Sequence, residues 1–449
     1  MIKKRPATAR EVAAFSLFSM AEDGAWSDGA LHQYLARAGL PGRDAALATR
    51  LCYGVLQNRA MCDFYLAKFS SVRLRKIAPR VLDCLRLGVY QLTMMERIPA
   101  HAAVGETVAL IEKYAHASPR TVGYANGVLR AVARAAQEGG LPVLDCPDKE
   151  SYYALRYSHP EWLVRALSAQ FGQKEAGKIC EANNRTAPLS LRVNTLRTTR
   201  EDALRALADA GFEPRPHEAI ADVILCAGGD IASLPLFRDG LVTVQDGAGA
   251  VCADILSPTP GALTVDCCAA PGGKSFALAA RMQDVGRVVS CDIYEHKLDR
   301  IREGAARLGL GCIEPRLADA TRLQNDLAGQ ADFVLCDVPC SGMGIIRKKP
   351  EIRYKPEAEL AGLPALQGAI LENCAQYVRP GGTLVYSTCT VLERENAGVV
   401  EGFLAAHPGF SAVPFTHPAC GERPDGMVTL LPHVHDTDGF FIAKLRRNA

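Results

Sequence analysis

The sequence predicts a multi-domain protein with an all-α N-terminal domain, a small α/β domain and a C-terminal Rossmann-like α/β domain. Three observations lead to this fold class. The chain has 449 residues, about three times the length of a typical domain. Apolar residues recur at helical spacing over the first third, and strands alternate with helices over the last part. We therefore expect domains at residues 1–140, 141–255 and 256–449.

The N-terminal third is expected to be helical throughout. Val81, Leu85, Val89 and Leu92 follow one another at spacings of three and four, which places them on one helix face. Prolines and glycines separate such segments, and a run of two glycines and a proline at 139–142 is typical of a domain boundary. Residues 1–140 therefore form the predicted helical domain.

The middle region has a mixed pattern. Helices are expected at Glu161–Phe171 and Arg200–Ala210, and strands at Leu189–Asn194, Val223–Cys226 and Leu241–Gln245. This order indicates a small α/β domain.

From about residue 256 strands and helices alternate strictly, which predicts a parallel sheet with helices on both faces. Such sheets bind ligands beyond the carboxyl ends of their strands, so ligand-binding and catalytic residues are expected just after each strand. The strands are expected at Leu263–Cys267, Val288–Asp292, Phe333–Asp337 and Thr383–Ser387, with one more before Asp319. The helices are expected after Gly273 and at Lys297–Leu308, Leu366–Tyr377 and Glu393–Ala406.

Composition excludes several protein classes. Hydrophobic residues at 48% and charged residues at 22% are globular values, which argues against a disordered chain. No run of about 18 apolar residues occurs, and Met1–Pro6 leads into a helical pattern without a signal-peptide core. We therefore expect a cytoplasmic protein with no membrane partner, and expect it to be a monomer.

The cysteines indicate free thiols. Sixteen cysteines are scattered along the chain without any C-x-x-C pair. Adjacent Cys267 and Cys268 point to opposite faces of a strand, so they cannot both bind one tetrahedral metal ion. No metal is expected.

Charge is distributed unevenly. Residues 1–140 carry 19 Lys and Arg against 11 Asp and Glu, a net charge of +8, whereas the rest of the chain carries −6. A basic domain suits contact with a phosphate backbone, although on charge alone a solvated helical surface explains the surplus equally well. The first candidates for RNA contact are Arg73, Arg75, Lys76 and Arg80.

A glycine-rich turn follows the first strand of the C-terminal sheet. Its Gly-Lys-Ser ending does not make a phosphate-binding loop, because that motif needs glycine where Cys268 stands, and the dinucleotide pattern also fails. A short glycine turn at a helix N-terminus suits a carboxylate, such as that of S-adenosylmethionine. The expected cofactor-binding residues in this turn are Cys268, Ala269, Ala270, Pro271, Gly272, Gly273 and Lys274.

Aspartates follow the next strands. Asp292 is placed to accept hydrogen bonds from ribose hydroxyls, Asp319 could meet the adenine amino group, and Asp337 completes the cofactor set. Each aspartate alone is more often a helix cap, but aspartates at successive strand ends favour a binding site.

Two cysteines follow neighbouring strands. Cys340 comes shortly after Asp337, and Cys389 follows the next strand, so both should meet at one cleft. A single buried cysteine is usually inert, but two cysteines beside a carboxylate indicate a catalytic site.

These motifs resemble those of the S-adenosylmethionine-dependent RNA cytosine-5 methyltransferases of the Sun type, and the domain order resembles the bacterial 16S ribosomal RNA group with a NusB-like N-terminal domain. The main motifs are Asp266–Lys274, Asp337–Gly342 and Tyr386–Thr390. The resemblance also covers His101–Val108, Tyr124–Arg130, Tyr157–Pro160 with Trp162, Arg192–Asn194, Gln245–Asp246 and Asp438–Phe441. Thr390 stands where the family pattern has serine.

The resemblance implies methylation of carbon 5 of a cytosine in 16S ribosomal RNA, at position 967, with S-adenosylmethionine as cofactor. It implies that Cys389 adds to carbon 6, that Cys340 assists breakdown of the adduct and that Asp337 holds the edge of the base. Further RNA contacts are expected from Arg192, Asn194, Arg347, Lys348 and Lys349.

Three other functions stay open. A DNA cytosine-5 methyltransferase would place its nucleophile at Pro339-Cys340 and would not need Cys389. A transfer-RNA methyltransferase shares the catalytic motifs. A non-catalytic RNA-binding factor could retain the NusB-like domain, and the intact cysteines, Asp337 and glycine turn argue against it.

Overall fold

The computed structural model describes residues 4–227 and 229–449, and it divides into two compact units. The helical unit runs to Asn184 and includes Lys348–Lys355. The sheet unit contains Arg185–Arg347 and Pro356–Ala449. Met1, Ile2 and Lys3, on which the expectation about a signal peptide partly depends, lie outside the described residues.

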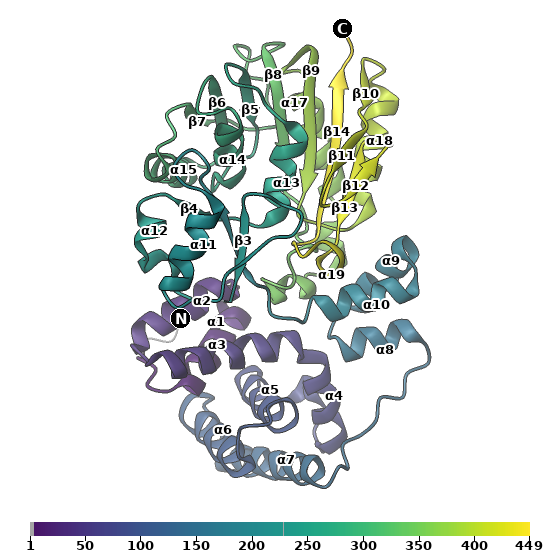
Figure 1. Cartoon of the computed structure of the whole chain (residues 1–449). Helices are drawn as coiled ribbons and strands as arrows, with labels where there is room; N and C mark the ends of the chain where they lie inside the picture. The colour runs from purple at the N-terminus through teal and green to yellow at the C-terminus, as the bar shows by residue number, and fades with distance from the viewer. Residues whose placement is uncertain (1–3, 228) are drawn as a thin grey trace. The chain divides into compact units, whose positions relative to one another are not determined.

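Residues 4–137 of the helical unit confirm the predicted all-α domain (Figure 1). Its largest fully buried side chains include Phe15, Leu51, Leu85, Ile111 and Leu129, which form one apolar core. The helices are α1 Ala9–Asp23, α2 Ser27–Ala38, α3 Gly42–Gln57, α4 Arg59–Phe69, η1 Leu74–Lys76, α5 Pro79–Met94, α6 Ala100–Tyr114 and α7 Pro119–Gln137.

Local sequence explains where these helices begin. The hydroxyl of Thr8 accepts a hydrogen bond from the Glu11 backbone N–H at 3.2 Å and so caps α1. Ser118 caps α7 in the same way, and Pro119 occupies the first helical position, where a missing N–H costs nothing.

The helical unit continues past the expected boundary at residue 140. Helices α8 Lys149–Arg156, α9 Glu161–Phe171 and α10 Gln173–Ala182 belong to it, as does the short helix η3 Pro350–Tyr354. Arg353 in η3 is fully buried and donates to the carbonyl of Tyr157 and to the side-chain oxygen of Asn184. The compact unit is therefore longer than the predicted helical domain, and Arg353 joins its parts by donating to the carbonyls of both Gln57 at the end of α3 and Tyr157 after α8.

The small sheet of the sheet unit has the order β2-β3-β1-β4, and its paired strands are antiparallel. Leu191, Ile224 and Val242 from its strands pack with Ala203 and Leu207 of α11. The elements are β1 Leu189–Val193, α11 Arg200–Asp209, β2 Arg215–Pro216, β3 Val223–Cys226, η2 Ile231–Ser233, α12 Pro235–Arg238, β4 Val242–Val244 and α13 Gly247–Leu256.

The large sheet has the order β10-β14-β9-β8-β5-β6-β7, with β13 paired to β14 (Figure 1). Its strands are β5 Leu263–Asp266, β6 Arg287–Asp292, β7 Ile313–Leu317, β8 Ala331–Asp337, β9 Val378–Thr388, β10 Phe410–Ala412, β13 Met427–Leu430 and β14 Phe440–Arg447. Its helices are α14 Gly273–Arg281, α15 Glu295–Leu308, α16 Glu357–Leu360, α17 Leu363–Ala375, η4 Glu393–Glu395, α18 Ala397–Ala406 and α19 Pro432–His435. A separate hairpin pairs β11 Phe415–His417 with β12 Gly421–Arg423.

Strands β7, β6, β5, β8 and β9 are parallel, as predicted, but the sheet continues with antiparallel strands that the prediction lacked. The connection from β13 to β14 holds only the short helix α19 and is too short for a parallel crossover, so these two strands pair in the antiparallel sense.

Alternating side chains divide the sheet into two faces. Val265 and Val334 pack with α17 and α18, whereas Leu335 and Val385 pack with α13 and α14. The chain leaves β5 towards β6 and β7 and later returns to β8 on the other side of β5. This reversal places the carboxyl ends of β5 and β8 side by side, the position where open α/β sheets bind ligands.

Candidate active site

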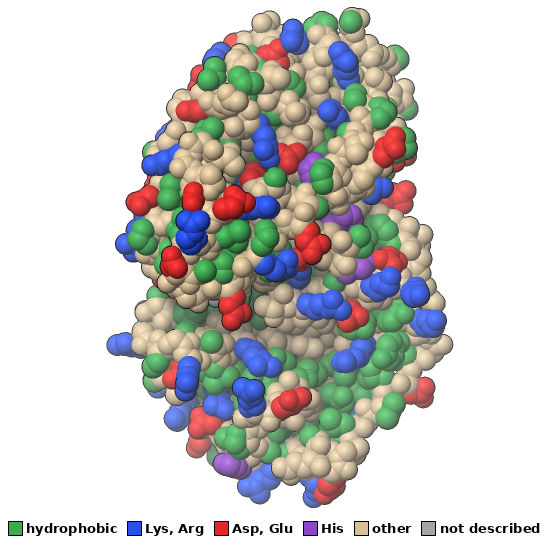
Figure 2. Space-filling model, in the orientation of Figure 1, with side chains coloured by type: hydrophobic (Ala, Val, Ile, Leu, Met, Phe, Trp, Pro, Cys, Tyr) green, Lys and Arg blue, Asp and Glu red, His purple; other side chains and the backbone are tan. Residues whose placement is uncertain are grey.

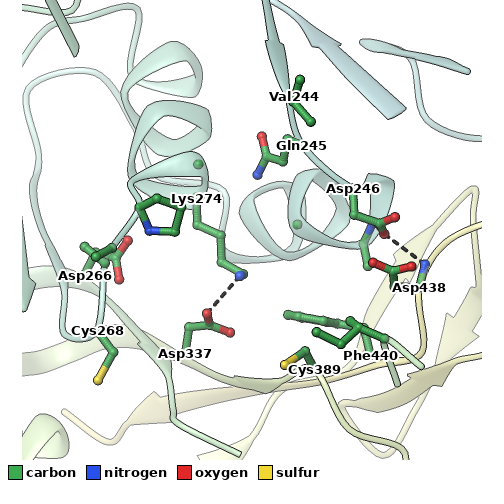
Figure 3. A pocket seen from close by; sticks show the side chains of 17 residues that line it. Val244, Gln245, Asp246, Asp266, Cys268, Lys274, Asp337, Cys389, Asp438 and Phe440 are labelled. Atoms are coloured by element: carbon green, nitrogen blue, oxygen red, sulfur yellow. Dashed lines mark hydrogen bonds and ion pairs between the residues drawn. The ribbon is translucent and has the colours of Figure 1, made fainter. Parts of the chain in front are cut away.

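A cavity of about 250 Å³ lies at the carboxyl ends of β5, β8 and β9 (Figure 3). The glycine turn after β5 and the ends of β8 and β9 supply one set of lining residues. The segment after β4 and the start of β14 supply the rest. The labelled lining residues are Val244, Gln245, Asp246, Asp266, Cys268, Lys274, Asp337, Cys389, Asp438 and Phe440.

Two thiols meet at the edge of this cavity. The sulfur atoms of Cys340 and Cys389 are 3.2 Å apart, and both side chains are half-buried. The hydrogen bond from Cys340 lowers the pKa of Cys389, against the effect of burial. The same bond, with burial, raises the pKa of Cys340 well above its ordinary value. These opposite pKa shifts favour a thiolate on Cys389 and a protonated thiol on Cys340.

Buried hydrogen bonds hold the loop that carries Cys340. A side-chain oxygen of Glu395 accepts from the Ser341 backbone N–H at 2.8 Å and from Gln367 at 2.9 Å. The Ser341 hydroxyl donates to the Thr390 hydroxyl at 2.9 Å. Thr390 thus supplies the hydroxyl that the serine of the family pattern would supply.

A second network holds the loop that carries Cys389. The hydroxyl of Thr388 donates to Asn396 at 2.6 Å, and the Asn396 amide donates to the Thr390 carbonyl at 3.1 Å. The backbone N–H of Gly344 donates to the Cys389 carbonyl at 3.0 Å, and a Cβ at Gly344 would lie 1.8 Å from the Gly439 carbonyl oxygen. Only glycine allows these chain segments to approach so closely.

Lys274 and Asp337 form an ion pair that faces the cavity. The Lys274 amine is 2.8 Å from one Asp337 oxygen, and the Ser387 hydroxyl donates to the other at 2.8 Å. Burial opposes the charge of Lys274, but Asp337 outweighs it and the pKa of Lys274 is raised. The same amine lies 5.1 Å from the centre of the Phe440 ring. The pair is therefore charged and fixed in position.

The glycine turn has the geometry of a small anion site. Gly272 has φ of +107°, and a Cβ there would lie 2.4 Å from the ring of Phe276, so only glycine fits. The turn leads directly into the N-terminus of α14.

Asp266 lies beneath this turn with no exposed surface. One oxygen accepts from the Ser275 hydroxyl at 2.6 Å, and the other has no hydrogen-bond partner among the described residues. Burial raises the pKa of Asp266 to about 7. An unpartnered carboxylate oxygen beside a helix N-terminus suits a ligand that carries both an amine and a carboxylate.

Comparisons with known proteins agree with this site. A family model described as 16S rRNA methyltransferase RsmB/F matches residues 253–446. A model of the NusB family matches residues 7–134, and one described as the ferredoxin-like domain of RsmF/B-like methyltransferases matches residues 159–229.

Curated relatives match over nearly the full length. Ribosomal RNA small subunit methyltransferase B of Vibrio cholerae is 38% identical over 442 residues, covering 98% of this chain and 97% of the relative. The protein of the same name from Vibrio vulnificus is 36% identical, covering 98% and 99%. This chain belongs to the ribosomal RNA small subunit methyltransferase B family. The solved structure of PH0851 shares the fold, with a TM-score of 0.83 at 25% identity over 99% of this chain and all of the other.

Membership of the methyltransferase B family confirms the predicted fold class. The NusB model coincides with the helical domain and the ferredoxin-like model with the start of the small α/β region. The methyltransferase model begins within α13 and covers the large sheet.

The predicted cofactor residues fall into two groups. Cys268–Pro271, Gly273, Lys274 and Asp337 line the cavity, and Gly272 shapes the turn. Asp292 and Asp319 lie at the ends of the neighbouring strands and outside the cavity lining. Asp292 accepts from the Tyr294 backbone N–H, and hydrogen bonds from Thr321 lower the pKa of Asp319.

The predicted RNA-contact residues of the helical unit differ in exposure. Arg73, Arg75 and Lys76 are exposed at η1. Arg80 instead binds Glu22 at 2.5 Å and the Tyr114 carbonyl at 3.2 Å, which neutralises much of its charge. In the face drawn in Figure 2, Lys and Arg side chains are dispersed over the helical unit with acidic side chains between them.

Several other predicted RNA contacts are not on the surface. Arg192 and Asn194 are 2% and 4% exposed, and the Asn194 amide donates to the carbonyls of Gly240 and Leu308. Arg347 is 9% exposed and donates to the Thr437 carbonyl. Arg192, Asn194 and Arg347 therefore each have a partner within the protein, and their contact with RNA stays a prediction.

Lys348 and Lys349 belong to the helical unit, not to the unit that holds the cavity. Lys349 lies 3.4 Å from Asp28 and stacks over Trp26, so its charge already has partners.

Nine residues of the cavity lining were absent from the predicted site: Val244, Gln245, Asp246, Ala248, Gly249, Asp266, Ile345, Asp438 and Phe440. The family motifs could have indicated Gln245-Asp246 and Asp438-Phe440 as site residues. Reasoning from strand ends could not, because neither segment follows a strand of the parallel sheet. The Asp438 backbone N–H donates to Asp246 at 2.9 Å, which joins these two distant segments at the cavity wall.

Two searches of the described residues are negative. No helix in the part of the chain that the structure describes is long and apolar enough to cross a membrane. Within residues 4–227 and 229–449, no group of three or more His, Cys, Asp or Glu side chains is arranged around a possible metal ion.

Proposed function

We propose that this protein is a cytoplasmic, monomeric enzyme that methylates carbon 5 of cytosine 967 in 16S ribosomal RNA with S-adenosylmethionine. The reaction passes through a covalent bond between Cys389 and carbon 6 of the base. The observation that carries this proposal is the 3.2 Å separation of the Cys340 and Cys389 sulfurs beside a charged Lys274–Asp337 pair. The names of the relatives support ribosomal RNA as the substrate.

The residues around the glycine turn fit S-adenosylmethionine. The N-terminus of α14 would hold the carboxylate of its methionine part, and the unpartnered oxygen of Asp266 would hold the amine. Asp292, at the end of β6, would bind ribose hydroxyls. When bound, this cofactor supplies a methyl group made electrophilic by its sulfonium.

Cys389 makes the target carbon reactive. Carbon 5 of cytosine is a weak nucleophile, because its electrons belong to the conjugated ring. Addition of the Cys389 thiolate to carbon 6 breaks the 5,6 double bond and leaves carbon 5 with enamine character. The Asp337 carboxylate, which lines the cavity, would hold the exocyclic amine and the protonated ring nitrogen and so stabilise the charge that develops.

Cys340 assists the second half of the reaction. After methyl transfer, a water molecule takes the carbon 5 proton, the electron pair of that C–H bond re-forms the 5,6 double bond, and the bond from carbon 6 to Cys389 breaks with its electron pair on sulfur, releasing the thiolate. The Cys340 thiol, 3.2 Å from that sulfur, is placed to donate a hydrogen bond to the departing thiolate. The raised pKa of Cys340 and the lowered pKa of Cys389 both support this arrangement.

Sequencing of bisulfite-treated RNA tests the function. A deletion strain should lose one 5-methylcytosine from 16S ribosomal RNA, and the wild-type gene should restore it. Loss of a mark from transfer RNA instead would assign the transfer-RNA alternative. Binding of S-adenosylmethionine to the purified protein, measured by titration calorimetry, separates an enzyme from an RNA-binding factor without activity.

The paired thiols predict a specific pH dependence. The rate of adduct formation follows the thiolate fraction of Cys389, so it is high above the pKa of that thiol and falls as the pH drops through it. Because Cys340 lowers this pKa, the acid limb lies below that of an ordinary cysteine. In the Cys340→Ala variant the limb should move to higher pH, as measured by single-turnover adduct formation. An unmoved limb would show that the hydrogen bond does not tune Cys389.

A further inference from the structure

Gln245 presents an unused hydrogen-bond donor to the cavity. The residue directly follows β4, and its side chain is 8% exposed. Its carbonyl oxygen accepts from the Arg192 guanidinium at 2.5 Å. Its amide nitrogen has no hydrogen-bond partner among the described residues, although Gln245 lines the cavity. Figure 3 shows the oxygen and nitrogen of this amide pointing in different directions.

Arg192 determines which way the amide faces. A guanidinium can only donate hydrogen bonds, so it fixes the oxygen of Gln245 on its own side and leaves the NH₂ group for the cavity. Burial lowers the pKa of Arg192 to about 10, which still leaves it charged at neutral pH. The carboxylates of Asp222 and Asp254 favour this charge, so the guanidinium that orients the Gln245 amide is stabilised within the protein.

Glycines leave space around this amide. A Cβ at Gly249 would lie 2.7 Å from the Gln245 nitrogen, and one at Gly273 would lie 3.7 Å from the side-chain carbonyl carbon. Larger residues at Gly249 would push the amide out of place. Gly249 and Gly273 therefore leave room for the Gln245 amide on two sides.

The position of Gln245 favours the target base over the cofactor as its acceptor. Gln245 comes from the small sheet, and with Asp246 it lines the cavity across from Cys389 and Phe440 in Figure 3. In a pyrimidine held with carbons 5 and 6 at the cysteines, carbon 2 lies across the ring from carbon 5. Asp337 occupies the amine edge, so the carbonyl oxygen on carbon 2 is the acceptor left for a donor on the opposite wall.

We infer that the Gln245 amide, oriented by Arg192, donates a hydrogen bond to the carbonyl oxygen on carbon 2 of the target cytosine. This inference rests on the proposed function and adds a base-contacting residue to it. The contact fixes the plane of the base, so that carbon 6 faces the Cys389 sulfur.

The test compares the wild type with Gln245→Glu and Gln245→Met. Glutamate keeps the acceptor for Arg192 and removes the donor, whereas methionine keeps only the length. The substrates are two RNA oligonucleotides that differ at the target, one with cytidine and one with 2-thiocytidine, whose sulfur is a poor acceptor. For the cytidine RNA, kcat/KM should fall by about tenfold in both variants, the effect of one lost hydrogen bond. Calorimetric binding of S-adenosylmethionine should stay unchanged.

The decisive result is non-additivity. For the wild type, kcat/KM should be about tenfold lower with the 2-thiocytidine RNA than with the cytidine RNA. For each variant, kcat/KM should differ little between the two RNAs. The inference would be overturned if kcat/KM of the variants also fell about tenfold from the cytidine RNA to the 2-thiocytidine RNA. It would also be overturned if the variants bound S-adenosylmethionine more weakly than the wild type. Thermal unfolding checks that each variant folds, and agreement of two chemically different variants excludes a purely structural effect. A wild type that does not methylate carbon 5 of the cytidine RNA would contradict the proposed function instead.

Discussion

Replacement of Cys389 by alanine should abolish methyl transfer while leaving cofactor binding intact. Without a thiolate at carbon 6, carbon 5 stays part of the conjugated ring, and the rate should fall by at least about a thousandfold, as expected when a nucleophile acting with its partners is removed. The glycine turn and Asp266, which are expected to hold the cofactor, do not depend on the Cys389 sulfur. Calorimetry should therefore give the same dissociation constant for S-adenosylmethionine.

The matched control for this variant is Cys146→Ala. Cys146 is a partly exposed free thiol outside the cavity lining, so its loss should not change the methylation rate. The measurement is incorporation of labelled methyl groups into 16S ribosomal RNA. Substantial turnover by the Cys389 variant would rule out the covalent mechanism, and it would direct attention to Cys340 as the nucleophile.

Replacement of Cys340 by alanine should trap the enzyme on its RNA. The adduct can still form through Cys389, but its breakdown loses the thiol that lies 3.2 Å from the departing sulfur. Release should slow by at least about a hundredfold, the usual range for loss of a general acid or base. Denaturing gels should then show a protein–RNA band that requires S-adenosylmethionine for its full yield.

The double variant provides the control for this trapped species. Cys340→Ala combined with Cys389→Ala should give no band, because no sulfur remains to bond carbon 6. A band that persists in the double variant would come from another residue and would contradict the assignment. Absence of a band in the single variant, with normal folding, would remove the release role of Cys340.

Sequence patterns predicted the parts of the fold that depend on local periodicity. The strands Val223–Cys226 and Arg287–Asp292 and the helix Glu161–Phe171 lie within two residues of their predicted bounds, because burial of one face dictates a spacing of two or near 3.6. The strands after residue 409 were missed, because most of them are short, and the longer β14 is buried along most of its length and so lacks an alternation of apolar and polar residues.

The candidate site was predicted only where it follows parallel strands. Cys340, Cys389 and Asp337 were found, because the carboxyl ends of neighbouring strands must meet. Gln245 and Asp438 were not, because they reach the cavity from distant segments. Asn194, a polar residue of a family motif that was expected to contact RNA, is buried and donates to backbone carbonyls, which no local pattern indicated.

By itself, the sequence determined the kinds of domain, the order of the main strands and the pair of cysteines that the chemistry needs. Those features follow from side-chain periodicity and from motifs that are continuous in the chain. Only the tertiary structure decided which cations are exposed, how the pKa values of the two thiols differ and which amide lines the cavity with an unpartnered nitrogen. These depend on burial and on contacts between residues far apart in sequence, such as Arg192 with Gln245, and no local pattern records them.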